Sequence, residues 1–234
     1  MTRESVLTSL ERTRLVPVLR APSEALAIEA ADALVAGGIR VLEVTLTVPN
    51  AVSLIRSLAA RSERAPEHER PIIGAGTVVT PDEADACMDA GAQFIVSPGL
   101  NLALVEQVRN RGIAVMPGAL TPSEIITAWQ AGADMVKVFP CSAVGGVGYV
   151  RSLRGPLPTV KLFPTGGVNL DNAGAYLKAG ASALGVGADL VDVTALAGGE
   201  PQRLTERARA FLAIVSKASQ PSHLPAAPPS MPTL

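Results

Sequence analysis

A lysine lies in the middle of the apolar run formed by residues 135–139, where a charged side chain is uncommon. Side chains alternate between the two faces of an extended strand, so Met135, Lys137 and Phe139 share one face. An amine that loses its hydration is more readily neutral, and a neutral amine attacks a ketone to form a Schiff base. The alternative is a structural lysine that is ion-paired or extends outward from the strand end.

The other lysines are less well placed for such chemistry. The chain has four lysines against sixteen arginines. Lys178 and Lys217 fall on predicted helices, and Lys161 falls at a strand position that faces outward. Position therefore favours Lys137 as the candidate nucleophile.

Glu43 is a second candidate, because it lies mid-strand on the same face as Val41 and Thr45. An unpaired buried carboxylate is costly, so Glu43 must have a partner or a raised pKa. Close to a neutral amine it could transfer protons as a general acid and base. The alternative is a structural ion pair with Arg20 or Lys137, and the two interpretations are compatible.

Glycines follow two further apolar runs, in Thr165-Gly166-Gly167 and in Gly185-Val186-Gly187-Ala188. Backbone N–H groups in loops of this kind bind phosphate in many α/β barrels. The alternative is a pair of tight turns without a ligand.

A repeated pattern predicts the elements that position these residues. A helix rich in small residues ends in Ala-Gly, and a short apolar run follows. Such runs are too short for helices and rich in Val and Ile, which is typical of buried strands. Eight strands are predicted, with room for a helix in each gap, at residues 15–19, 39–44, 71–75, 94–96, 113–116, 135–139, 160–163 and 183–186.

Strand–helix alternation repeated eight times is typical of an α/β protein with a closed (β/α)8 TIM barrel, and an open doubly wound sheet is the alternative. We expect an extra N-terminal helix near residues 5–12 and a charged loop at residues 62–70. We predict one barrel domain over residues 1–218 and a disordered, Pro-rich tail over residues 219–234. Capping residues predict helix starts near Ser23, Asn50, Thr80, Thr121 and Asn169.

Composition disfavours several other classes of protein. The net charge of −1 argues against nucleic acid or an anionic membrane surface as a partner. No apolar run reaches the ~18 residues of a membrane helix, and the start does not resemble a secretory signal, so we expect a cytoplasmic protein. His68 and His223 are the only histidines, and Cys87 and Cys141 the only cysteines, without the spacing of metal ligands. Metal catalysis and a Ser–His triad are therefore disfavoured.

Several stretches at the predicted strand ends resemble the family of 2-keto-3-deoxy-6-phosphogluconate (KDPG) and 4-hydroxy-2-oxoglutarate (KHG) aldolases. The resemblance extends from about Leu15 to Phe211, and its specificity comes from several stretches in the right order. They are Val16-Pro17-Val18-Leu19-Arg20, Leu42-Glu43-Val44-Thr45-Leu46, Ile73-Gly74-Ala75-Gly76-Thr77-Val78, Ser97-Pro98-Gly99, Lys137-Val138-Phe139-Pro140 and Phe163-Pro164-Thr165-Gly166-Gly167-Val168.

The resemblance implies a class I aldolase, a carbon–carbon lyase that reversibly cleaves KDPG to pyruvate and glyceraldehyde 3-phosphate without a metal or organic cofactor. It also implies a homotrimer and a place in the Entner–Doudoroff pathway. Lys137 matches the Schiff-base lysine and Glu43 the general acid and base. The implied substrate contacts are Thr77 for the pyruvate portion, Pro98 and Thr165 for the pocket, and Gly166, Gly167, Gly187 and Ala188 for the phosphate.

Two positions depart from the family pattern. Thr47 stands where many members have an arginine that contacts the substrate carboxylate, and we expect Arg20, one strand away, to supply that charge. Ala188 stands where many members have a serine, which removes one hydrogen bond to the phosphate, about 1–2 kcal/mol.

Other functions remain compatible with these residues. The same chemistry could act on 2-keto-3-deoxy-6-phosphogalactonate or on unphosphorylated 4-hydroxy-2-oxoglutarate. A phosphosugar isomerase or epimerase would use Glu43 as base and Lys137 as its electrostatic partner. A non-catalytic barrel would bind a phosphorylated metabolite or serve as an assembly subunit.

Overall fold

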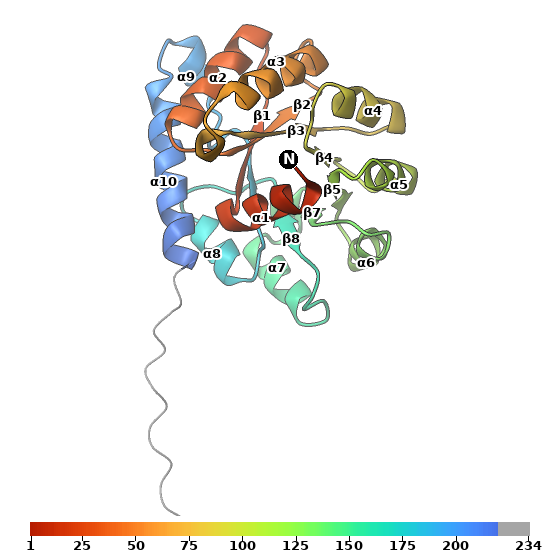
Figure 1. Ribbon diagram of the computed structural model, residues 1–234. Coiled ribbons are helices and arrows are strands. Elements are labelled where there is room, and N and C mark those ends of the chain that lie inside the picture. Colours follow the sequence, from red (N-terminus) through yellow and green to blue (C-terminus); the bar gives the residue numbers. More distant parts are fainter. Residues whose placement is uncertain (220–234) are drawn as a thin grey trace, which may run out of the picture.

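Short parallel strands lie at the centre of the fold and helices form a ring around them (Figure 1). The computed structural model describes residues 1–219, without the side chains of His68 and Ser219. The strands are β1 (Leu15–Leu19), β2 (Val41–Thr45), β3 (Ile72–Gly76), β4 (Phe94–Val96), β5 (Ala114–Met116), β6 (Gly118–Ala119), β7 (Val136–Val138), β8 (Leu162–Pro164) and β9 (Leu184–Val186). The helices are α1 (Arg3–Thr13), α2 (Glu24–Ala36), α3 (Ala51–Arg64), α4 (Pro81–Asp89), α5 (Leu102–Asn110), α6 (Pro122–Gln130), α7 (Val147–Arg154), α8 (Ala173–Lys178), α9 (Val193–Ala197) and α10 (Gln202–Ser219), with short 3₁₀ helices η1 (Glu67–Glu69) and η2 (Cys141–Val144).

The strands close into a ring through two hydrogen-bonded sheets, ordered β5-β4-β3-β2-β1-β9 and β6-β7-β8. Only Pro117 separates β5 from β6, so they are two halves of one strand position, the first paired with β4 and the second with β7. At the other junction, a parallel bridge joins Thr165 to Gly185, and the N–H of Ser182 donates to the carbonyl of Leu162 at 2.8 Å. The predicted (β/α)8 barrel is therefore confirmed.

Some predicted boundaries were wrong. The helix expected near Asn169 begins four residues later as α8, because Asn169 Oδ1 accepts the N–H groups of Asp171 and Asn172 and closes a turn instead. Much of the expected loop at residues 62–70 is helical, since α3 continues to Arg64 and η1 follows. The two-residue strand β6 was not predicted. The tail expected from Ser219 lies outside the described residues, apart from Ser219 itself, which ends α10.

Most helix ends carry the local signals that the sequence predicted. The side chains of Ser23, Thr80 and Thr121 each accept a main-chain N–H three residues later, which satisfies an otherwise unpaired donor. Asn50 also occupies an N-cap position, without a capping hydrogen bond from its side chain. A glycine with positive φ follows the C-cap in each of the four Ala-Gly repeats, at Gly38, Gly91, Gly132 and Gly180.

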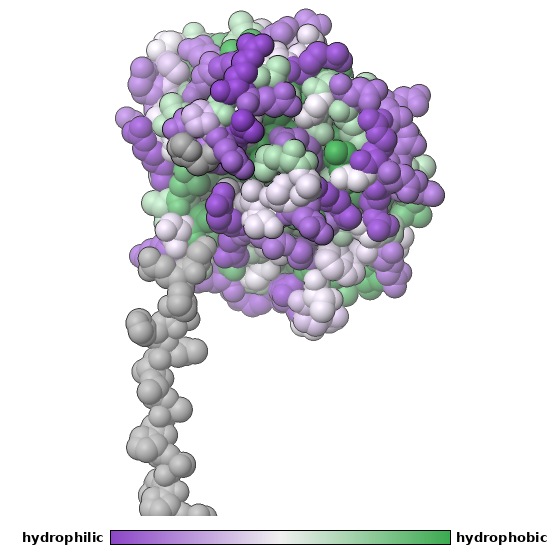
Figure 2. Space-filling model, viewed as in Figure 1, coloured by the Kyte–Doolittle hydropathy of each residue, from purple (hydrophilic) through white to green (hydrophobic). Residues whose placement is uncertain are grey.

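The expected N-terminal helix, α1, seals one end of the barrel, and it crosses in front of the strands in Figure 1. Its buried Val6 and Leu10 belong to the apolar cluster inside the barrel, together with Val16, Phe94 and Phe163. A second and larger cluster fills the layer between the strands and the outer helices. The face that α1 covers is largely hydrophilic at its surface (Figure 2).

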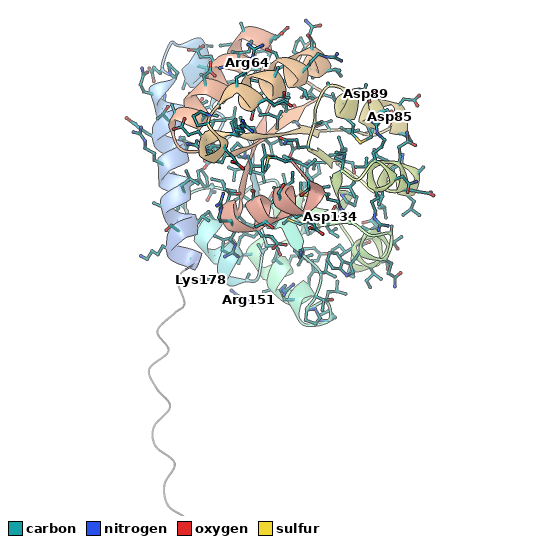
Figure 3. The ribbon with its side chains drawn as sticks, in the orientation of Figure 1. Arg64, Asp85, Asp89, Asp134, Arg151 and Lys178 are labelled. Atoms are coloured by element: carbon teal, nitrogen blue, oxygen red, sulfur yellow. The ribbon has the colours of Figure 1, made fainter. Side chains whose placement is uncertain are left out.

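A partly buried ion pair joins α1 to Asp134. Arg3 donates from Nε and Nη2 to the two carboxylate oxygens of Asp134, at 3.3 and 2.7 Å, and Asp134 also accepts the N–H of Val115. Figure 3 shows Asp134 beside the first turn of α1. The side chain of Asp134 is only 6% exposed, whereas that of Arg3 is 34% exposed.

Replacing Arg3 with alanine is expected to lower the free energy of unfolding by about 1–2 kcal/mol, because the largely buried side chain of Asp134 loses the two hydrogen bonds that Arg3 donates. Urea unfolding followed by circular dichroism measures the loss. Arg12→Ala is the control, since Arg12 is exposed on the same helix. Equal losses in the two variants would show that the ion pair does not hold α1.

Candidate active site

Lys137 and Glu43 face each other inside the barrel. Lys137 lies on β7, in register with Gly118 on one side and Phe163 on the other. Glu43 lies on β2, in register with Val18 and Gly74. The Lys137 Nζ atom is 3.8 Å from Glu43 Oε1, and the two residues are 4% and 0% exposed. The inward orientation predicted from strand alternation therefore brings the two groups together as an ion pair.

The carboxylate of Glu43 is poised for proton transfer. Within residues 1–219, neither Oε1 nor Oε2 accepts a hydrogen bond. Burial raises the pKa of Glu43, and the positive charges of Lys137 and Arg20 oppose that rise. A carboxyl group with a raised pKa and an oxygen that accepts no hydrogen bond can accept and return a proton during the reaction. Its missing hydrogen bonds leave room for a substrate hydroxyl or a water molecule.

Gly76 provides the space that the Glu43 side chain occupies. A methyl group on Gly76 would lie 2.0 Å from Glu43 Oε1, which is far inside van der Waals contact. The strand β3 therefore needs a residue without a Cβ at this position, although the φ of Gly76 does not itself demand glycine.

Gly76→Ala is expected to displace the Glu43 carboxylate and lower kcat/KM by roughly 10²-fold, as misplacement by about 1 Å can do. Initial rates and a circular dichroism spectrum would measure the effect on a folded protein. The control is Gly148→Ala, because Gly148 lies in α7 and a methyl group added there would meet nothing within 4 Å. A Gly76→Ala enzyme with full activity would mean that the position of Glu43 is not critical.

A cavity of about 710 Å³ opens above this pair at the C-terminal ends of the strands. Among the predicted substrate contacts, those that line it are Arg20, Thr47, Thr165, Gly166, Gly167, Gly187 and Ala188. Lys137 and Glu43 are not among its lining residues, but Phe139 is, and its ring centroid is 5.1 Å from Lys137 Nζ. Thr165 also faces inward, and its buried Oγ1 has no hydrogen-bond partner within the described chain. Phe139 therefore connects the lining of the cavity to the buried amine.

Thr77 and Pro98 lie outside the lining of this cavity. Thr77 directly follows Gly76 and has a φ of 61°. This is a left-handed backbone conformation that residues other than glycine rarely adopt. The main chain of Pro98 packs on Gly118, where a methyl group would lie 2.3 Å from the Pro98 carbonyl. Because Gly118 is in register with Lys137, a single strand position, that of β5 and β6, separates Pro98 from the strand that carries the amine.

The glycine loops present main-chain donors to the cavity. Gly166 and Gly167 have φ values of 89° and 78°, so both need the conformational freedom of glycine. Within the described residues, the N–H groups of Gly167 and Ala188 donate to no main-chain carbonyl. Amides of this kind suit an anion such as phosphate. Ala188 offers no hydroxyl beside them.

Phe139 and Asp189 are among the cavity residues that were not predicted as site residues. Phe139 shares the face of Lys137, so the alternation pattern could have identified it. Asp189 also lines the cavity, and Arg207 of α10 donates to its main-chain carbonyl and lies 3.4 Å from its Oδ1 atom. That contact joins residues distant in sequence, and no local pattern signals it.

A model of the family "KDPG and KHG aldolase" matches residues 6–207. The chain belongs to the KDPG and KHG aldolase family. The KHG/KDPG aldolase of Escherichia coli (strain K12) is 40% identical over 207 residues, which cover 88% of this chain and 92% of that protein.

Solved structures agree with this family. KDPG aldolase from Legionella pneumophila, with pyruvate captured at low pH as a covalent carbinolamine intermediate, is 32% identical with a TM-score of 0.79, over 88% of this chain and 97% of that one. A structure described as native KDPGal is 31% identical with a TM-score of 0.78, over 87% and 95% of the two chains. Aldolases of this family are carbon–carbon lyases. The names of these relatives refer to more than one substrate, since they include KHG, KDPG and KDPGal.

Two features are absent from residues 1–219. None of the helices there is long and apolar enough to cross a membrane. Over the same residues, no three His, Cys, Asp or Glu side chains come together as a possible metal site.

Proposed function

We propose that this member of the KDPG and KHG aldolase family cleaves KDPG to pyruvate and glyceraldehyde 3-phosphate through a Schiff base on Lys137. The observation that carries the proposal is the buried amine of Lys137, which lies 3.8 Å from a carboxylate whose oxygens accept no hydrogen bond within residues 1–219 and 5.1 Å from the ring of Phe139, a residue that lines the cavity. An amine in this setting can add to a ketone, and the nearby carboxylate can transfer the protons that the addition and dehydration require.

The roles of the two groups follow from their positions. Lys137 Nζ attacks the C2 ketone, and Glu43 transfers protons as the carbinolamine loses water. Glu43 then removes the proton of the C4 hydroxyl, the C3–C4 bond breaks, and its electrons enter the iminium. The aldehyde leaves, the enamine takes up a proton at C3, and hydrolysis releases pyruvate and the free amine.

The remaining lining residues support binding of an anionic substrate. Arg20 lines the cavity where Thr47 provides only a hydroxyl, so we propose that Arg20 binds the substrate carboxylate. The N–H groups of Gly167 and Ala188 are the proposed phosphate donors. Thr47 is itself engaged, since its Oγ1 is 2.7 Å from the buried Oγ1 of Thr45.

The missing hydroxyl at Ala188 favours a second substrate class with the same chemistry, unphosphorylated 4-hydroxy-2-oxoglutarate. The galactonate analogue of KDPG is a further candidate, because it differs from KDPG only in stereochemistry. Comparing kcat/KM for KDPG, its galactonate analogue and 4-hydroxy-2-oxoglutarate separates the three.

Borohydride reduction in the presence of pyruvate tests the Schiff base directly. We expect a reduced pyruvate adduct on the peptide that contains Lys137, identified by mass spectrometry. The peptide that contains Lys161 is an internal control, because Lys161 is exposed and paired with Glu11. A folded protein without the Lys137 adduct would contradict the proposal and favour an isomerase, an epimerase or a binding protein on the same barrel.

The family resemblance also leads us to propose a cytoplasmic homotrimer. Light scattering during size-exclusion chromatography would then give three times the chain mass of 24.0 kDa. A mass of one chain at micromolar concentration would contradict it.

A further inference from the structure

The loop that follows β9 carries a carboxylate at the proposed phosphate end of the cavity. Asp189 lines the cavity and directly follows Ala188, whose N–H group is a proposed phosphate donor. A tight turn holds this loop, because the N–H groups of Leu190 and Val191 both donate to the carbonyl of Gly187 at 2.9 Å. The amide donor and the carboxylate therefore come from adjacent residues of one turn.

The charge of Asp189 has no counterpart within its own loop, because residues 187–192 contain no lysine, arginine or histidine. The Oδ2 atom of Asp189 is buried and accepts no hydrogen bond within residues 1–219. An anionic group bound at the Ala188 amide would meet this carboxylate at close range, and like charges repel most strongly where water is scarce. On its own, Asp189 would therefore oppose the binding of a phosphate at this end of the cavity.

A counter-charge comes from α10, which runs along the outside of the barrel (Figure 1). Arg207 of this helix lies 3.4 Å from Asp189 Oδ1 and donates to the main-chain carbonyl of the same residue. The guanidinium keeps its proton under ordinary conditions, so it offsets the negative charge of Asp189. The two side chains are 33% and 35% exposed, so solvent screens the pair only in part.

A second arginine of α10 makes a similar contact without reaching the cavity. Arg203, one helical turn before Arg207, lies 3.7 Å from Asp192 Oδ2. Asp192 caps α9 by accepting the N–H of Ala195, and it is not among the residues that line the cavity. Of these two arginines, Arg207 is therefore the one that offsets a charge at the substrate.

We propose that Arg207 is a positioning residue for phosphorylated substrates, and that it acts through Asp189. By offsetting the carboxylate charge beside the Ala188 amide, it allows the far end of the cavity to accept a phosphate. Without Arg207, the same end of the cavity would favour a substrate that lacks the phosphate. This inference rests on the proposed function and deepens it, since it concerns how the phosphate of KDPG is admitted.

The test measures kcat and KM for KDPG in Arg207→Gln, which removes the charge and retains a hydrogen-bond donor. At low ionic strength KM is expected to rise about tenfold with kcat within about twofold of the wild type, because the phosphate is remote from the bond that breaks. The rise should shrink in about 0.5 M sodium chloride, since salt screens the charge of Asp189. Arg207→Lys keeps the positive charge and should stay close to the wild type.

Asp189→Asn in the Arg207→Gln background separates an electrostatic role from a merely structural one. It removes the uncompensated charge, so the double variant should recover a KM within about twofold of the wild-type value. Loss of a purely structural contact would show no such recovery. Arg203→Gln is the matched control, because it removes an equal charge from the same helix beside Asp192, and its KM should not change.

Borohydride inactivation with pyruvate keeps this inference distinct from the proposed function. Pyruvate carries no phosphate, so the concentration that half-saturates inactivation should be equal in the wild type and in all variants. A rise in KM for KDPG that Asp189→Asn restores would support the inference.

Three results would overturn the inference and leave the Schiff-base mechanism standing: an unchanged KM in Arg207→Gln, a rise that Asp189→Asn does not restore, or an equal rise in Arg203→Gln. A wild-type protein that forms the pyruvate adduct without cleaving KDPG would contradict KDPG as the substrate and the inference with it. A folded wild-type protein without the adduct on Lys137 would overturn the proposed function itself.

Discussion

Lys137→Arg is expected to abolish turnover, with a loss in kcat on the order of 10⁴-fold or more, the scale seen when an enzyme loses its nucleophile. Guanidinium keeps its proton under all ordinary conditions and cannot add to a ketone. The substitution retains a positive charge opposite Glu43, so the barrel interior still holds one positive and one negative side chain. Loss of activity would then report the chemistry of the amine, because the charge is still present.

Two measurements make this result specific. Borohydride with pyruvate should leave the Lys137→Arg protein unmodified at residue 137, and its circular dichroism spectrum should match that of the wild type. Lys161→Arg should retain normal kcat, because Lys161 lies on the outside of the barrel, where its side chain is 42% exposed. Turnover of Lys137→Arg at the wild-type rate would rule out the Schiff base.

Glu43→Gln is expected to lower kcat by about 10²–10⁴-fold, the usual contribution of a positioned general acid or base. Glutamine is close to glutamate in size, so it should fit the space above Gly76 without a new steric contact. It cannot accept and return a proton, and it leaves Lys137 without a counter-charge. The matched control is Glu106→Gln, because Glu106 is exposed on α5.

The pH dependence gives this prediction a second readout. Burial raises the pKa of Glu43, and a general base must be ionised to act. As the pH falls through that raised pKa, kcat/KM should decline, with its acidic limb above the pKa of a free glutamate, about 4.3. Glu43→Gln should remove this limb. An unchanged limb in the variant would assign the titration to another group and argue against Glu43 as the base.

Much of the fold followed from local patterns in the sequence. Strand positions could be predicted because the buried runs are short and apolar, and several of them follow a helix that ends at a glycine with positive φ. The split at Pro117 could not, since the pairing of Gly118 with Lys137 depends on how β7 meets the ring. The start of α8 was predicted wrongly because Asn169 caps a turn as well as it caps a helix, and both uses satisfy the same donors.

For the candidate site as well, some features could be predicted from the sequence and others could not. Alternation along two strands was enough to orient Lys137 and Glu43 toward the interior, and the closed barrel brings them to 3.8 Å. Position 76 requires glycine because the side chain of Glu43, on the neighbouring strand β2, passes over it. The sequence of β3 alone does not reveal that contact. The cavity is lined by the loops that follow β1 and β9, which are distant in sequence, and the parallel pairing of these two strands makes the loops neighbours.

The seal that α1 forms has a consequence for the proton chemistry at the other end of the barrel. The pKa of Glu43 rises because water is kept away from it, and Val6 and Leu10 close the lower entrance of the interior. The first helix, which touches no part of the cavity, therefore helps to set the dielectric environment of the carboxylate. The pKa of Glu43 therefore depends on burial, to which this helix contributes by closing the barrel interior, as well as on the charges of Lys137 and Arg20.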